Sequence, residues 1–420
     1  MAKTRSRLFY GMSNVASGFV GMGLCYGMFT IFAFGSFVGP LQEEFGWSRG
    51  ELSFAITMAN IAVVIASPCL GILIDRYGVR RVLIPSVVLM AITVASMSML
   101  TANIWHYYAL YFLIPFLGAG TLPQSYSRVL IAWFNKRRGI ALGFSLSGFG
   151  VGALLIPIVA QMTIGAFGWR VSYLFFAAAV ILLALPMAIF LMKETPEALG
   201  FSADEEQQDG EQAEIDVIIA SEIGLSGKEA VRTSSYWLIL SSFLLVGVGL
   251  TGIIAHLVPL LIDRGVEPAT AALCMSGIGL GIIFGRILAG FLMDYFFAPY
   301  VTSFFLLGMV AGIIILAMGT TGPLVFVAAV CVGMASGSEI SEIAYICSRY
   351  FGQKAFGQIY GFMFAAFQLG ACFGAPLMGI YHDKVGNYIG ALWLLAAIVF
   401  LGAILIALLK PYPDLQKVSS

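Results

Sequence analysis

The chain has 420 residues, of which 60% are hydrophobic and only 10% are charged, and its mean hydropathy is +0.94. A soluble domain cannot bury that much apolar surface, so the composition indicates a polytopic membrane protein. The 22 basic and 22 acidic residues balance, which gives no indication of a nucleic-acid partner.

Apolar runs of roughly 20 residues predict twelve transmembrane helices. The predicted segments are 18–39, 51–74, 82–100, 107–133, 140–166, 171–192, 236–260, 269–293, 300–319, 322–346, 357–380 and 387–409. An even number of crossings puts both termini on one side. Sixteen of the 22 lysines and arginines fall on that side, four fall on the other, and Arg128 and Arg286 lie inside predicted helices. Because positive residues accumulate in cytoplasmic loops, we expect a cell (inner) membrane protein with both termini in the cytoplasm.

One long polar stretch, residues 194–234, separates the helices into two sets of six. Its acidic, glutamine-rich centre cannot sustain a packed core, so we expect a cytoplasmic linker there. The domains predicted from the sequence are therefore an N-terminal six-helix bundle at 1–193, the linker at 194–234, and a C-terminal six-helix bundle at 235–420.

The two halves repeat the same motifs. GILIDRYGVRR, from Gly71, returns as GFLMDYFFAPY, from Gly290, and WFNKRRGIALGF at 133–144 returns as YFGQKAFGQIYGF at 350–362. Both pairs have nearly the same separation, which indicates that a six-helix unit was duplicated. Parallel repeats of this kind place a substrate site near mid-membrane, where the repeats meet.

These motifs make the chain similar to the major facilitator superfamily over nearly its whole length. GILIDRYGVRR resembles the loop signature of that superfamily, with Gly71, Asp75, Arg76, Gly78 and Arg80 in matching positions. The resemblance implies an all-α membrane protein with twelve transmembrane helices in two pseudo-symmetric six-helix bundles. It also implies that Asp75 and Arg76 act in gating, as a latch that governs conformational switching.

Residues 26–55, 133–143 and 285–294 further resemble the monocarboxylate transporters and the oxalate:formate antiporters. In those families an arginine in helix 8 binds the substrate carboxylate, and Arg286 falls on that position. The helix 11 lysine of the oxalate exchangers is replaced by Phe367, which argues against a small dicarboxylate. The lysine near helix 1 of animal monocarboxylate carriers also has no counterpart, so the resemblance does not support their coupling scheme here.

Arg286 is also the leading candidate on physical grounds. An unpaired guanidinium in hydrocarbon is unfavourable by about 3 to more than 10 kcal/mol, so such a residue normally faces a cavity, a partner or a ligand. A planar guanidinium matches a carboxylate with two parallel hydrogen bonds. The structural alternative is a permanent ion pair that joins helix 8 to a neighbouring helix.

Two glutamates of predicted helix 10, Glu339 and Glu342, are candidates for proton coupling. Counted from the cytoplasmic end at a rise of about 1.5 Å per residue, Glu339 is about as deep as Arg286, and the two glutamates share a helix face. Two buried, mutually repelling carboxyl groups suit a site that holds a proton. In this hypothesis Glu339 takes up a proton and releases Arg286 for an anion. The alternative is a fixed Arg286–Glu339 bridge, with Glu342 reaching toward the interface.

Predicted helix 4 carries a polar stripe at helical spacing, formed by Thr121, Gln124, Ser125 and Arg128. Gln124 and Ser125 are candidates to hydrogen-bond a substrate oxygen. Arg128 lies only six residues from Phe134 at the cytoplasmic end, so holding an inner gate or reaching the interface are alternatives to ligand binding.

Aromatic and amide side chains complete the predicted pocket. The resemblance implies that helices 1 and 11 border the cavity, which makes Tyr26, Phe364 and Gln368 candidates for substrate binding. A mostly apolar cavity with one cation suits an amphipathic monocarboxylate better than a sugar, which needs many more polar side chains.

The sequence therefore predicts a monomeric secondary active transporter that moves a small organic monocarboxylate together with a proton by alternating access. An organic-anion exchanger would keep Arg286 but need no titrating carboxylate. A drug exporter is disfavoured because residues 143–157 do not reproduce the glycine–proline pattern of helix 5 in proton-drug antiporters. A non-transporting receptor with the same fold is a further alternative. The expected partners are the carboxylate, the proton and the lipid bilayer, with no cofactor, metal or enzymatic activity.

Overall fold

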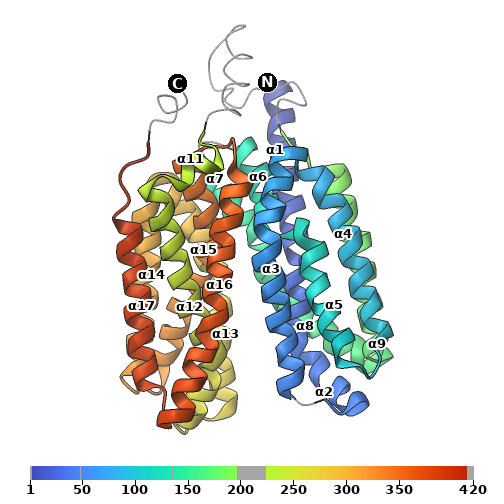
Figure 1. Ribbon diagram of the computed structural model, residues 1–420, viewed down its shortest axis with the longest axis vertical. Coiled ribbons are helices and arrows are strands. Elements are labelled where there is room, and N and C mark those ends of the chain that lie inside the picture. Colours follow the sequence, from blue (N-terminus) through green and yellow to red (C-terminus); the bar gives the residue numbers. More distant parts are fainter. Residues whose placement is uncertain (1, 48, 135–136, 196–223, 414–420) are drawn as a thin grey trace. The chain divides into compact units, whose positions relative to one another are not determined.

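The computed structural model describes residues 2–47, 49–134, 137–195 and 224–413 (Figure 1). Residues 196–223, most of the predicted linker, therefore lie outside the described residues. The chain divides into two compact units. Unit 1 comprises Met1–Lys136, Phe144–Gly224 and Gln353–Gly361, and unit 2 comprises Arg137–Gly143, Leu225–Gly352 and Phe362–Ser420.

Unit 1 holds most of the helices of the first half. They are α1 (Ala2–Gly23), α2 (Phe34–Phe45), α3 (Arg49–Tyr77), α4 (Val79–Ser96), α5 (Ile104–Leu117), α6 (Pro123–Trp133), α7 (Arg138–Leu146), which begins in unit 2, α8 (Gly148–Phe167) and α9 (Trp169–Ala179). A π-helical turn (Met28–Phe32) connects α1 to α2, and two more (Val180–Ala184 and Met187–Leu191) continue α9.

Eleven helices of the described part of the chain are long and apolar enough to cross a membrane. They coincide with eleven of the twelve predicted segments. The exception is 107–133, where a continuous helix is wrong: α5 ends at Leu117, a 3₁₀ turn follows (Gly118–Thr121), and α6 starts at Pro123.

Proline explains this break. Leu122, immediately before Pro123, has extended backbone angles (φ −63°, ψ 151°), because the proline ring disfavours the α conformation in the residue before it. Thr121 thus lies on the 3₁₀ turn and not on α6, so the predicted polar stripe is not one continuous helical face. Gln124, Ser125 and Arg128 do share α6.

Unit 2 holds α11 (Gly227–Val231), α12 (Ser234–Asp263), α13 (Pro268–Tyr295), α14 (Ala298–Ala317), α15 (Pro323–Phe351), most of α16 (Phe356–Val385) and α17 (Ile389–Ala407). The long helices of this unit, coloured yellow-green to red in Figure 1, run along a common direction. Helix α15 packs most extensively against α13 and α14. Each of these two neighbours presents different side chains to it.

Candidate functional site

A seam of glycines brings α13 and α15 unusually close. A Cβ added at Gly285 would lie 2.2 Å from the carbonyl oxygen of Met334, and one added at Gly337 would lie 2.1 Å from that of Ile282. Neither distance is possible for a real side chain, so the two backbones meet directly. Small residues four apart are the usual means of such an approach between membrane helices. Gly333, four residues before Gly337, makes the same kind of contact with Ile278.

The seam sets the register of the helices and thereby positions Arg286. This residue directly follows Gly285 and is only 1% exposed. Its Nε donates a hydrogen bond to the carbonyl oxygen of Gly337, at 2.7 Å. That bond orients the plane of the guanidinium, whose other four N–H donors are on the two Nη atoms. An alanine at position 337 would separate the carbonyl from its donor.

Glu339 lies two residues beyond Gly337 and acts on Arg286. The charge of the guanidinium acts on its carboxyl group, and Glu339 is 7% exposed. Burial of a guanidinium is strongly unfavourable without an opposite charge. The structure thus brings together two of the predicted residues, one cation and one anion, on neighbouring helices of unit 2.

Glu342 lies on the same helix but has different neighbours. It is 1% exposed, and the groups that interact with its carboxyl group are the hydroxyls of Ser338 on α15 and Thr302 on α14. The alternative in which Glu342 reaches the membrane interface does not fit this burial. Glu339 and Glu342 are therefore two buried acids with unlike partners.

Phe364 and Gln368 lie one turn apart on the part of α16 that belongs to unit 2, and both are buried. The ring of Phe364 stacks on Phe367, with 6.1 Å between the centroids. The backbone oxygen of Gln368 accepts a hydrogen bond from the thiol of Cys372.

In unit 1, Gln124 is fully buried and its side-chain amide bonds to α3. Its Nε2 donates to the backbone oxygen of Ser67 at 2.9 Å, and its Oε1 accepts from the Ser67 hydroxyl at 3.1 Å. A substrate that used this amide would have to replace both bonds. Ser125, also buried, has no hydrogen-bond partner for its hydroxyl within the described part of the chain, and Tyr26 is buried with its backbone oxygen bonded to Thr30.

Asp75 caps a helix N-terminus. Its two carboxylate oxygens accept hydrogen bonds from the backbone N–H groups of Gly357 (3.0 Å) and Gln358 (2.8 Å), in the segment of α16 that belongs to unit 1. Arg128 lies 3.9 Å from the same carboxylate and donates to the Gln353 side chain at 3.1 Å. The first N–H groups of a helix have no intrahelical partner and carry partial positive charge, so a carboxylate stabilises them.

The duplicated motif repeats this arrangement in unit 2. Asp294, which corresponds to Asp75, accepts hydrogen bonds from the backbone N–H groups of Gly139 (2.7 Å) and Ile140 (3.0 Å) at the start of α7. Both copies of the loop motif retain its first glycine and this aspartate. Arg76, in contrast, is exposed and lies over the ring of Tyr77 at 5.2 Å, so the structure does not join it to the Asp75–Arg128 pair.

Removing one of these caps should destabilise the protein. We expect Asp294→Ala to lower the free energy of unfolding by about 1–2 kcal/mol, because two helix N–H groups lose their acceptor. Denaturant unfolding of the purified protein in detergent measures this. Glu267→Ala is the matched control, since Glu267 precedes α13 without a side-chain capping bond. An effect of Asp294→Ala no larger than that of the control would contradict the capping role.

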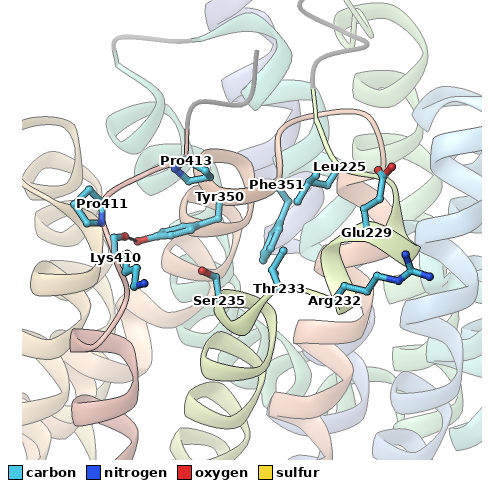
Figure 2. Close-up of a pocket in the computed structure, with 10 residues that line it drawn as sticks. All are labelled: Leu225, Glu229, Arg232, Thr233, Ser235, Tyr350, Phe351, Lys410, Pro411 and Pro413. Atoms are coloured by element: carbon cyan, nitrogen blue, oxygen red, sulfur yellow. Dashed lines mark hydrogen bonds between the residues drawn. The ribbon is translucent and has the colours of Figure 1, made fainter. Parts of the chain in front are cut away.

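A cavity of about 430 Å³ lies in unit 2, and none of the residues predicted for the site lines it. Figure 2 shows its lining, which includes Leu225, Arg232, Tyr350, Phe351 and Lys410. The hydroxyl of Tyr350 donates a hydrogen bond to the backbone oxygen of Lys410 at one side of the cavity, while Arg232 lies at the other side. Within the described residues, no group of three His, Cys, Asp or Glu side chains is placed to hold a metal ion.

The eleven apolar helices make the chain a multi-pass membrane protein. The family model of the Major Facilitator Superfamily matches residues 18–375, so the chain belongs to this superfamily of membrane transporters. It is 25% identical over 408 residues to monocarboxylate transporter 11 of Homo sapiens, covering 94% of this chain and 82% of that protein. It is 26% identical over 405 residues to the uncharacterized MFS-type transporter YcxA of Bacillus subtilis (strain 168), covering 92% and 91%.

Solved structures show the same fold. The proton:xylose symporter XylE superposes with a TM-score of 0.78 at 17% identity, covering 98% of this chain and 99% of that one. FucP in its outward conformation gives a TM-score of 0.69 at 16% identity, covering 94% and 99%. At these identities the likeness concerns the fold alone.

Gly337, Thr302 and Ser67 are among the residues of the site that were not predicted. The glycine had a visible signal, since Gly281 and Gly285 on one segment and Gly333 and Gly337 on another repeat the same small-residue spacing. Thr302 and Ser67 had none. A single hydroxyl in an apolar helix does not reveal which distant residue it contacts.

Proposed function

We propose that this transporter moves a small organic monocarboxylate by alternating access, together with a proton. The observation that supports this most directly is Arg286, a fully buried guanidinium held in orientation by Gly337 and accompanied by one carboxylate, Glu339. One guanidinium at the site matches a substrate with one carboxylate. The relationship to monocarboxylate transporter 11 favours the same substrate class.

In this mechanism Arg286 exchanges partners. Without substrate, Glu339 neutralises the guanidinium. When an acid enters, its carboxylate takes a share of the Nη donors, and the extra negative charge is compensated by a proton on one of the two glutamates of α15. Glu339 and Glu342 are the candidates for that proton. The positive charge of Arg286 and the negative charge of the substrate pair with each other and are shielded from lipid during the crossing. This pairing lowers the barrier to translocation.

Further residues are proposed in supporting roles. Tyr26, Ser125, Phe364 and Gln368 are proposed substrate contacts, and so is Gln124 if the substrate replaces its bonds to Ser67. Asp75, Arg76 and Arg128 are proposed to act in gating. We place the protein in the cell (inner) membrane with both termini in the cytoplasm, following the distribution of its lysines and arginines.

Uptake into vesicles tests the function. We expect purified protein in liposomes to take up one or more of acetate, lactate, pyruvate, hexanoate and benzoate when the interior is alkaline. With a gradient of one pH unit, a 1:1 symport can concentrate the anion up to about tenfold. Protein-free liposomes supply the background from passive diffusion of the neutral acids. No protein-dependent uptake of any of these acids would refute the proposal.

An anion exchanger gives a different pattern in the same vesicles. Its uptake survives a proton uncoupler and requires an unlabelled acid inside, because each entering anion is exchanged for a departing one. A symporter loses concentrative uptake when the uncoupler abolishes the pH gradient and needs no internal acid. The comparison decides between the two modes without any mutation.

A further inference from the structure

The two buried glutamates of α15 differ in what surrounds them. Glu339 interacts with a full positive charge, that of Arg286. Glu342 interacts with the uncharged hydroxyls of Ser338 and Thr302, of which the Ser338 hydroxyl also donates to the backbone oxygen of Ala335 at 3.0 Å. The two glutamates also repel each other. Both glutamates are almost inaccessible to solvent, so the difference lies in the partner and not in the degree of burial.

Helix register explains why Thr302 reaches Glu342. A Cβ added at Gly312 of α14 would lie 2.8 Å from the backbone oxygen of Ala328 of α15, which fixes one point of contact. Consecutive membrane helices run in opposite directions, so ten residues back along α14 and ten residues forward along α15 bring Thr302 level with Ser338. Glu342 is one turn beyond Ser338 on the same face, since residues four apart on a helix are neighbours.

Hydroxyl partners suit a group that changes its protonation state. A hydroxyl donates a hydrogen bond to a charged carboxylate and accepts one from a protonated carboxyl group, because it can act both as donor and as acceptor. An arginine only donates, so its charge favours the charged form of Glu339 and acts against the effect of burial. Within the described residues, Glu342 Oε1 and Thr302 Oγ1 are both buried and have no hydrogen-bond partner of ordinary geometry. When Glu342 Oε1 carries a proton, it can donate a hydrogen bond that Thr302 Oγ1 accepts.

We propose that Glu342, with Thr302 and Ser338 as its hydrogen-bonding partners, is the group that carries the transported proton, while Glu339 stays the counter-charge of Arg286. This inference rests on the proposed symport and assigns its proton to one residue. Among the described residues, the charged groups that interact with the two glutamates are the glutamates themselves and Arg286 on α13, and α14 contributes the uncharged Thr302. Thr302 and Ser338 are positioning residues in this scheme.

Charge balance gives the coupling. With Glu342 ionised, Arg286, Glu339 and Glu342 together carry one net negative charge, which repels an entering carboxylate. A proton from water that binds Glu342 cancels this charge, and the substrate then enters a site of zero net charge. Release of the substrate restores the affinity of Arg286 for Glu339, and Glu342 returns its proton to water on the other side. The proton and the anion therefore cross together.

Two assays on the full-length protein in liposomes separate proton coupling from substrate binding. Concentrative uptake driven by an alkaline interior needs both, whereas exchange of labelled for unlabelled acid at equal pH needs only substrate binding and reorientation. The probe is whichever acid of the panel above the parent protein accumulates most. We expect Glu342→Gln to lose the up to about tenfold accumulation of a one-unit gradient while keeping equal-pH exchange at least half as fast as in the parent.

Thr302 supplies a second, milder variant. We expect Thr302→Val, which removes the hydroxyl that a protonated Glu342 would bond, to shift the pH of half-maximal uptake by about one unit, the equivalent of about 1.4 kcal/mol, and Thr302→Ser to restore the parent value. Ser303→Ala is the matched control: its hydroxyl is also buried on α14 but bonds to the backbone oxygens of Pro299 and Ala403. This variant should leave the pH profile unchanged. The two Thr302 variants test whether Glu342 carries the proton even if Glu342→Gln does not fold.

The proton assignment fails if Glu342→Gln or Thr302→Val keeps the pH dependence of the parent, or if Glu339→Gln is the variant that loses accumulation but retains exchange. It also fails if a sodium gradient, and not a pH gradient, drives accumulation. These results leave the proposed substrate class intact. A parent protein that accumulates none of the acids refutes the proposed function itself, so the two failures are distinguishable.

Discussion

Arg286→Lys should weaken binding of the transported acid by about 10- to 100-fold, because a lysine keeps the charge but loses the planar fork that pairs with both carboxylate oxygens. A hydrogen bond between charged groups contributes about 1.5–3 kcal/mol, and 1.4 kcal/mol corresponds to tenfold in affinity. Ligand-induced thermal shift of the purified protein measures the change over a concentration series of the acid. The lysine would also lose the Nε bond that Arg286 donates to Gly337.

A second buried arginine of unit 2 supplies the control. Arg138 is 6% exposed and donates to the Ser348 hydroxyl at 2.9 Å, so Arg138→Lys makes the same chemical change at another buried position. We expect it to bind the acid within about threefold of the parent, since the change removes no proposed contact with substrate. Equal affinity of the parent and Arg286→Lys for every acid that binds would rule out Arg286 as the carboxylate site.

Gly337→Ala should destabilise the protein by about 1–3 kcal/mol, the usual range for a side chain forced into a space already filled. The added Cβ would lie 2.1 Å from the backbone oxygen of Ile282, and a backbone oxygen of a packed helix cannot turn aside as a flexible side chain can. Helices α13 and α15 must therefore move apart, which also draws the Gly337 carbonyl away from Arg286. Thermal unfolding in detergent measures the loss of stability, and the acid panel measures the accompanying loss of affinity.

Gly279 provides the comparison within the same helix. It lies on an exposed face of α13, where an added Cβ meets no atom within 4 Å. Gly279→Ala should be neutral or stabilise the protein by up to about 1 kcal/mol, because alanine restricts the unfolded chain more than glycine does. If the two alanine variants melt at the same temperature, the close packing of α13 on α15 is not what positions the site.

Much of the fold was predictable because a bilayer imposes a simple demand on the sequence. Each crossing must be a long apolar run, and eleven of the twelve predicted runs are helices of the required length. The break before Pro123 also has a local cause, the effect of proline on Leu122, so attention to that dipeptide would have predicted it. The burial of Arg286 could also be predicted from the sequence, since this cation lies inside an apolar segment.

The contacts of the site were less predictable, because they depend on register between helices that are distant in sequence. Gln124 was a candidate to hydrogen-bond a substrate oxygen because of its position on a polar stripe, and the sequence did not indicate that its amide bonds to Ser67 on α3. Periodicity identifies the polar face of one helix. It does not say which helix packs against that face or which residue is level with which.

The sequence by itself determined that the chain is a membrane-spanning helical protein, that its halves are repeats, and that Arg286, Glu339 and Glu342 are charges within apolar helices. Only the tertiary structure decided which of the two glutamates interacts with Arg286. The glycine seam sets the register of α13 against α15 so that Arg286 interacts with Glu339. The packing of α14 on the adjacent face brings the Thr302 hydroxyl to Glu342, in addition to the hydroxyl of Ser338 on its own helix. Two acids three residues apart look alike in sequence but differ in the fold, because α13 brings the charge of Arg286 to Glu339 and α14 brings the neutral hydroxyl of Thr302 to Glu342.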